Sequence, residues 1–134
     1  MGRQTEGVYM IRTILGAAAV SLALTSTAFA SSWTLHLSGI DDSMNVYVNG
    51  GLVYTCSFGQ TCSVNLSKYL IAGSNTLELQ LSNQAGAGWT FDYKLMKDGV
   101  AVLKAKCGKF NISGCMGDQE DTGVVYDVKV NILN

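Results

Sequence analysis

Two groups of carboxylates are the residues best suited to chemistry in this chain. Asp41 and Asp42 are adjacent, and a second acidic stretch contains Asp118, Glu120 and Asp121. Clustered carboxylate oxygens can bind Ca²⁺ when backbone carbonyls complete the coordination shell. We therefore take Asp118, Glu120 and Asp121 as a candidate calcium site, with a solvated loop as the alternative, because their spacing matches no defined calcium loop. Ca²⁺ is the only cofactor that the sequence suggests.

Trp89 and Asn111 are candidates for contact with a sugar. An exposed aromatic ring can stack on a sugar ring, and amide or carboxylate side chains can bond its hydroxyls. Together with Asp41 and Asp42, these two residues make up the candidate ligand-binding set. Trp89 also begins an alternating run of aromatic residues, and that pattern is typical of a core position. Both interpretations of Trp89 remain open at this point.

An enzyme is not expected. His36 is the only histidine, whereas serine or cysteine nucleophiles need a base that a third group orients. A glycosidase needs two carboxylates on opposite sides of one bond. Adjacent side chains on a strand point to opposite faces, so Asp41 and Asp42 cannot provide that pair.

The four cysteines are Cys56, Cys62, Cys107 and Cys115. If the chain is exported, as its first thirty residues predict (see the next paragraph), an even number of cysteines indicates disulfides. Four cysteines allow three pairings. We favour Cys56 with Cys62 and Cys107 with Cys115, because each pair brackets a short polar stretch that contains glycine. A zinc site is the alternative, but structural zinc sites favour closer spacing between paired cysteines.

Residues 1–30 have the features of a secretory signal peptide. A basic start at 10–13 precedes an apolar run at 14–24 and an A-x-A cleavage motif that ends at Ala30. The run is well short of the roughly 20 residues that cross a bilayer, so no membrane span is expected. Met10 is an alternative initiator. We expect a secreted or periplasmic protein with one domain at 31–134, and the alanine-rich signal is bacterial in style.

Composition excludes some classes of protein. The formal net charge is −1, with 48% hydrophobic and 14% charged residues. Binding to a phosphate backbone needs clustered cations, so nucleic acid is not an expected partner. The apolar content is too high for a disordered chain and predicts a buried core.

Alternation of apolar and polar residues predicts strands along the whole exported part. It occurs at 33–38, 44–49, 77–82, 90–95 and 126–132. Asn49-Gly50 and Asp98-Gly99 suit two-residue hairpin turns and predict hairpins at 46–54 and 91–104. About eight short strands with regularly spaced turns predict an all-β fold, an antiparallel β-sandwich.

Two segments carry a family resemblance. Residues 41–50, Asp-Asp-Ser-Met-Asn-Val-Tyr-Val-Asn-Gly, and residues 69–79, which contain Gly-Ser-Asn-Thr-Leu-Glu-Leu, resemble passages of galactose-binding-domain-like jelly rolls. Such modules accompany the catalytic domains of glycoside hydrolases. The resemblance implies a jelly-roll sandwich. It favours a non-enzymatic module that binds carbohydrate or a glycosylated surface through its end loops. The alternative is a structural or interaction subunit of a surface assembly that binds a protein partner through an exposed edge strand.

Overall fold

The alternating segments form eight strands in the computed structural model, which describes residues 30–84, 88–107 and 122–134. The strands are β1 (Trp33–Asp41), β2 (Ser43–Val48), β3 (Gly51–Ser57), β4 (Cys62–Asn65), β5 (Ser74–Asn83), β6 (Thr90–Lys97), β7 (Val100–Cys107) and β8 (Gly123–Leu133). No helix occurs within these ranges. The predicted signal peptide lies outside the described residues, except for Ala30.

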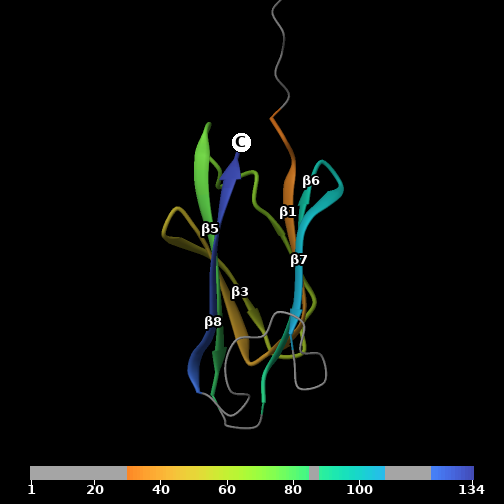
Figure 1. Ribbon diagram of the computed structural model, residues 1–134, viewed down its shortest axis with the longest axis vertical. Coiled ribbons are helices and arrows are strands. Elements are labelled where there is room, and N and C mark those ends of the chain that lie inside the picture. The colour runs from red at the N-terminus through yellow and green to blue at the C-terminus, as the bar shows by residue number, and fades with distance from the viewer. Residues whose placement is uncertain (1–29, 85–87, 108–121) are drawn as a thin grey trace, which may run out of the picture.

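The strands make two four-stranded sheets that lie face to face (Figure 1). The first sheet has the order β4-β1-β6-β7, and the second has the order β3-β2-β5-β8. All neighbouring strands are antiparallel. Only β2–β3 and β6–β7 are consecutive strands within one sheet, and every other connection crosses between the layers. The predicted antiparallel sandwich of eight strands is therefore confirmed.

The core forms because alternate side chains of each strand point into the space between the sheets. On β5, Leu77, Leu79 and Leu81 are almost completely buried, whereas Glu78 and Gln80 lie on the outer face. Burial of each leucine contributes about 1.5–3 kcal/mol. The other largest fully buried side chains come from the remaining strands and from positions next to them, and they are Trp89, Phe91, Leu35, Leu37, Ile40, Met44, Leu66, Leu95 and Ile132.

The two predicted hairpins are confirmed, and their turns have the expected backbone geometry. Asn49 and Gly50 have φ values of 51° and 81°, and Asp98 and Gly99 have values of 50° and 80°. Two consecutive residues with positive φ make the type of turn that matches the right-handed twist of the flanking strands. Asparagine, aspartate and glycine tolerate this conformation better than other residues do.

Asn75 joins the β2–β3 turn to the segment that precedes β5. Its side chain is 1% exposed, and its Oδ1 accepts hydrogen bonds from Asn49 Nδ2 and Ile71 N, both at 2.9 Å. Its Nδ2 donates to the carbonyls of Ile71 at 2.8 Å and Gly73 at 3.1 Å. Asn49 Oδ1 in turn accepts a hydrogen bond from Thr76 N at 2.9 Å. Asn49 and Asn75 both belong to the segments that resemble galactose-binding-domain-like jelly rolls. Their role here is structural, because they form hydrogen bonds with backbone groups at this end of the sandwich.

Replacement of this buried amide should destabilise the fold. We expect Asn75→Ala to lower the free energy of unfolding by about 1–3 kcal/mol, because it removes all the hydrogen bonds that this buried amide makes to Asn49, Ile71 and Gly73. Chemical denaturation measures the change. Asn131→Ala, at an exposed position of β8, is the control and should stay within about 0.5 kcal/mol of the wild type. Equal losses in the two variants would contradict this role for Asn75.

Candidate functional site

The predicted carboxylates lie where β1 ends and β2 begins. Asp41 is opposite Thr90 at the start of β6, so it lies at the same end of the sandwich as Trp89. Asp42 Oδ2 accepts a hydrogen bond from the backbone N–H of Gln84, and Asp42 N donates to the carbonyl of Ser82 at 3.2 Å. The structure thus brings three of the four candidate ligand-binding residues to one end of the molecule. The fourth, Asn111, lies outside the described residues.

Trp89 belongs to the core. Its side chain is 0% exposed, and its ring stacks on Phe91 with the centroids 6.2 Å apart and the planes at 5°. Trp89 precedes β6 but continues the inward phase of that strand, so the indole points away from the solvent. The structure therefore confirms the interpretation of Trp89 as a core residue and not as a sugar-binding residue. An indole in this position offers no surface to a sugar.

The carboxylates of Asp41 and Asp42 influence each other. Partial burial raises the pKa of Asp41, and the charge of Asp42 and a hydrogen bond between the two side chains raise it further. The predicted calcium ligands Asp118, Glu120 and Asp121 lie outside the described residues, so this site remains a prediction. Within the described ranges, no three His, Cys, Asp or Glu side chains come together as a metal site.

His36 occupies an exposed position in the middle of β1. It lies between Ser63 of β4 and Lys94 of β6 on the outer face of the first sheet. This placement agrees with the polar phase of the alternation at 33–38.

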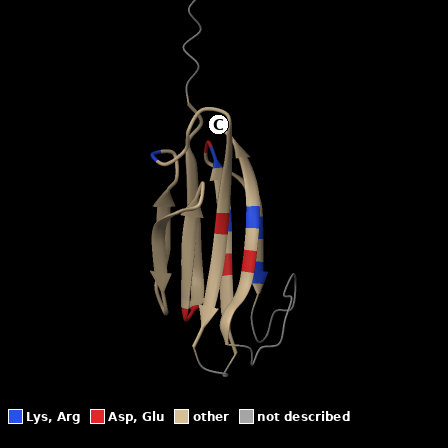
Figure 2. Ribbon diagram, turned by 90° about the vertical axis from the view of Figure 1, so that its left-hand side faces the viewer, with Lys and Arg blue, Asp and Glu red and all other residues tan. Residues whose placement is uncertain are grey.

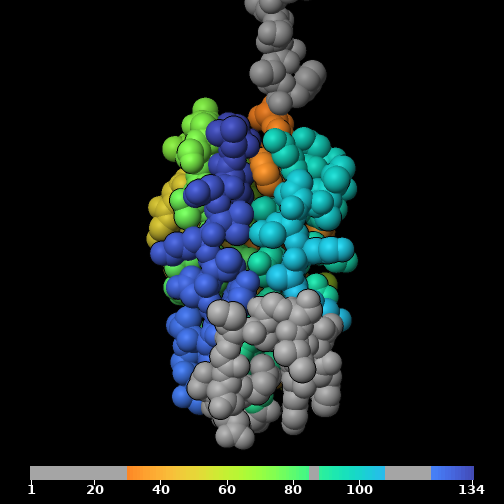
Figure 3. Space-filling view, viewed as in Figure 1, coloured from red at the N-terminus to blue at the C-terminus, as the bar shows by residue number. Residues whose placement is uncertain are grey.

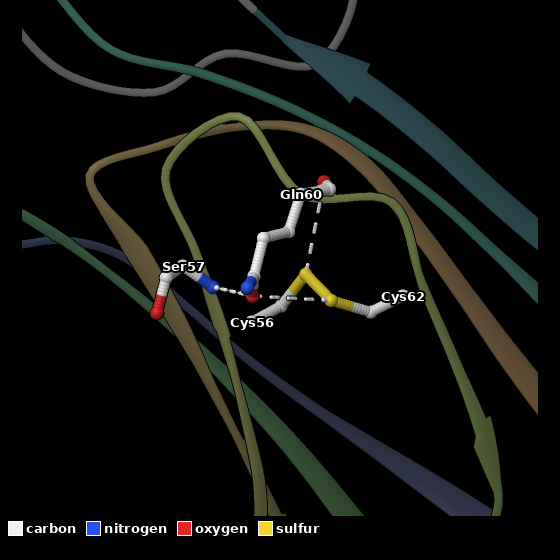
Figure 4. The surroundings of a disulfide bond; sticks show 4 residues. All are labelled: Cys56, Ser57, Gln60 and Cys62. Carbon is white, nitrogen blue, oxygen red and sulfur yellow. Dashed lines mark hydrogen bonds between the residues drawn. A yellow bond between two sulfur atoms is a disulfide. The ribbon is translucent and has the colours of Figure 1, made fainter.

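The predicted disulfide between Cys56 and Cys62 is confirmed, with the two Cα atoms 6.1 Å apart (Figure 4). It connects β3 of the second sheet to β4 of the first. Gln60 Oε1 accepts a hydrogen bond from Ser57 N at 3.1 Å inside the closed loop. Cys107 is also disulfide-bonded. Its predicted partner, Cys115, lies outside the described residues, so that pairing stays a prediction.

The outer face of the second sheet carries an ordered set of polar side chains. One row crosses all four strands in register and consists of Thr55, Asn45, Gln80 and Asp127. Thr55 Oγ1 donates to Asn45 Oδ1 at 2.8 Å, and Gln80 Nε2 donates to Asp127 Oδ2 at 3.1 Å.

A second row lies beside the first and consists of Leu52, Tyr47, Glu78 and Lys129. Glu78 links the two rows, because its Oε1 accepts a hydrogen bond from Gln80 Nε2 at 2.8 Å and its Oε2 lies 3.5 Å from Lys129 Nζ. We call these two rows the polar face.

Charge divides the polar face into two halves. Figure 2 shows acidic and basic residues on β5 and β8, whereas β2 and β3 carry none. The uncharged half offers hydroxyl, amide and tyrosine side chains, and the charged half offers carboxylates held by hydrogen bonds. Such groups suit a ligand rich in hydroxyls.

None of the residues of the polar face stands out in the sequence as a candidate for binding. The alternation identified the outward phase of each strand, but each strand by itself contributes only two residues to the rows. The rows arise when antiparallel register places Asn45 beside Gln80 and Gln80 beside Asp127. The rows could have been predicted only from the pairing of segments 44–49 and 77–82, because this pairing places Asn45 beside Gln80.

Comparison with known proteins adds no relative: no protein-family model matches the chain, and neither the curated proteins nor the solved structures give a significant match. No helix in the described part is long and apolar enough to cross a membrane.

The raised pKa of Asp41 predicts a stability change that depends on pH. A carboxyl whose pKa is raised by folding destabilises the folded state at a pH above its folded pKa, and this effect disappears below the unfolded value of 3.8. Asp41→Asn should therefore raise the melting temperature near pH 7. Near pH 3, where Asp41 is protonated in both states, the gain should vanish. Thermal unfolding at both pH values checks this expectation, and an equal gain at the two values would contradict it.

Proposed function

We propose that the chain is an exported, non-enzymatic module that binds carbohydrate on its polar face. The observation that supports this most directly is the hydrogen-bonded row Thr55, Asn45, Gln80 and Asp127 with Tyr47 beside it. Carbohydrates present closely spaced hydroxyls and apolar ring faces, so they need fixed donors and acceptors next to an aromatic surface.

Preorganisation favours the polar face over the end loops. Gln80 Nε2 bonds both Glu78 and Asp127, so its amide is held in one orientation. Side chains on paired strands are positioned more rigidly than side chains on loops. At the end of the sandwich, by contrast, burial removes Trp89 from the candidate site.

The resemblance to galactose-binding-domain-like jelly rolls supports the same class of function. The structure is a sandwich of two four-stranded antiparallel sheets, and jelly rolls belong to this wider class of fold. Export to a secreted or periplasmic location agrees with the leader-like residues 1–30 and with the disulfide between Cys56 and Cys62, since disulfides persist in oxidising compartments. Under this proposal, Ca²⁺ at Asp118, Glu120 and Asp121 would be a structural ion.

A second candidate function is that of a subunit in a surface assembly. It is favoured by the outermost strands β7 and β8, each of which has a strand neighbour on one side only among the described residues. Both strands also expose apolar side chains, which include Val100, Val102 and Val124.

A glycan array probed with the exported chain tests carbohydrate binding, and calorimetry with the best glycan then locates the site. We expect Tyr47→Ala and Gln80→Ala each to weaken affinity at least about tenfold, because each loss removes roughly 1.4 kcal/mol or more of contact energy. His36→Ala, on the outer face of the first sheet, is the control and should bind normally.

The outcomes separate the candidates. Loss of binding in Asp41→Asn, with normal binding in Tyr47→Ala and Gln80→Ala, would move the site to the end loops. An array without a bound glycan, both with and without Ca²⁺, would contradict carbohydrate binding altogether.

A further inference from the structure

β8 is the longest strand and forms an edge of the second sheet. It spans Gly123–Leu133 and pairs with β5 on one side, and no other described strand pairs with its second side. The backbone N–H and C=O groups along such an edge are free to pair with another strand. In Figure 3 the atoms of β8 run along the surface of the molecule, with deeper residues visible between β8 and β7.

The core-facing row of β8 is incompletely covered. Tyr126, Val128 and Val130 pack against the core but are only partly buried. Tyr126 reaches the first sheet, where its ring centroid lies 4.3 Å from that of Phe91. On the outer face, Val124 lies opposite Ser82 and Leu133 lies opposite Ser74, and these two side chains are 57% and 72% exposed. A neighbouring strand would therefore bury more of the apolar surface of Tyr126, Val128 and Val130.

The other edges are less suited to pairing. β3 and β4 are tied together by the Cys56–Cys62 disulfide, and β4 has only four residues. On β7, Lys104 lies opposite Lys94 of β6, and Lys106 follows two residues later on the same side of the strand. Self-pairing of β7 about Ala105 would place Lys104 against Lys106 of a second copy. Lysines on an edge oppose such pairing.

Charges on β8 favour self-pairing in one register. Asp127 and Lys129 lie on the outer face on either side of Val128. Antiparallel pairing of two β8 strands about Val128 places Asp127 of each copy opposite Lys129 of the other, which gives two attractive pairs. Pairing about Asp127 or Lys129 instead places like charges opposite each other, and this is unfavourable.

We infer that β8 pairs with β8 of a second copy of this chain, in the antiparallel register centred on Val128. The two second sheets then join into one continuous sheet of twice as many strands. Lys129 is available for the new contact because its side chain is 63% exposed and its ammonium has donors beyond the contact with Glu78.

The dimer would also extend the polar face, since the two copies expose their outer faces on the same side. A long polysaccharide could then contact both copies at once, which raises apparent affinity without any new type of contact. This consequence rests on the proposed function, whereas the pairing of the strands does not.

Charge substitutions on β8 test the pairing by sedimentation of the exported chain at about 100 μM, above the micromolar constants of weak interfaces. The wild type should sediment as a dimer. Asp127→Lys and Lys129→Asp should each raise the dissociation constant by about tenfold or more, because both symmetry-related pairs change from attraction to repulsion. An equimolar mixture of the two variants should form a heterodimer, because the first carries only lysines at these positions and the second only aspartates.

Formation of the heterodimer would also show that both variants are folded. Lys104→Asp, on the edge strand of the other sheet, is the matched control and should leave the dimer unchanged. A monomeric wild type, or variants that remain monomeric when mixed although their circular dichroism matches the wild type, would overturn the inference. Because sedimentation uses no glycan, failure here would leave the proposed carbohydrate binding intact, and an unresponsive glycan array would leave the dimer intact.

Discussion

Burial of alternate side chains between two sheets is the constraint on which the rest of this structure depends. A strand turns successive side chains to opposite faces, so burial of Leu77, Leu79 and Leu81 forces Glu78 and Gln80 to the outside. The same rule applies to β2, where burial of Val46 leaves Asn45 and Tyr47 on the outer face. The polar face is thus a geometric consequence of the core.

Different interactions hold the layers together in different parts of the molecule. On the side formed by β3 and β4, the Cys56–Cys62 disulfide links one sheet to the other. On the opposite side, the contact is between side chains: Tyr126 of β8 packs on Phe91 of β6, and its hydroxyl lies 3.2 Å from that of Tyr93. The side with the disulfide is closed covalently, and the side formed by β7 and β8 has only noncovalent contacts among the described residues. The self-association proposed above uses an edge on this second side, that of β8.

Charge then distinguishes between these two edges. β7 carries two exposed charges of the same sign, Lys104 and Lys106, whereas Asp127 and Lys129 on β8 are opposite in sign. The same two side chains contact Gln80 and Glu78 of the polar face within one chain. Carbohydrate binding and self-association, as proposed above, would therefore share residues, and a ligand that bridges two copies would couple them.

The sequence by itself determined the local features of this protein. Periodicity located the strands, Asn49-Gly50 and Asp98-Gly99 defined two hairpins, and the spacing of Cys56 and Cys62 indicated their disulfide, because each of these features depends on residues close together in the chain. Only the tertiary structure decided which residues from distant segments become neighbours. It placed Trp89 in the core and aligned Asn45, Gln80 and Asp127 in one row. The physical reason is that strand order and register arise from packing of the whole core, and no single segment contains that information.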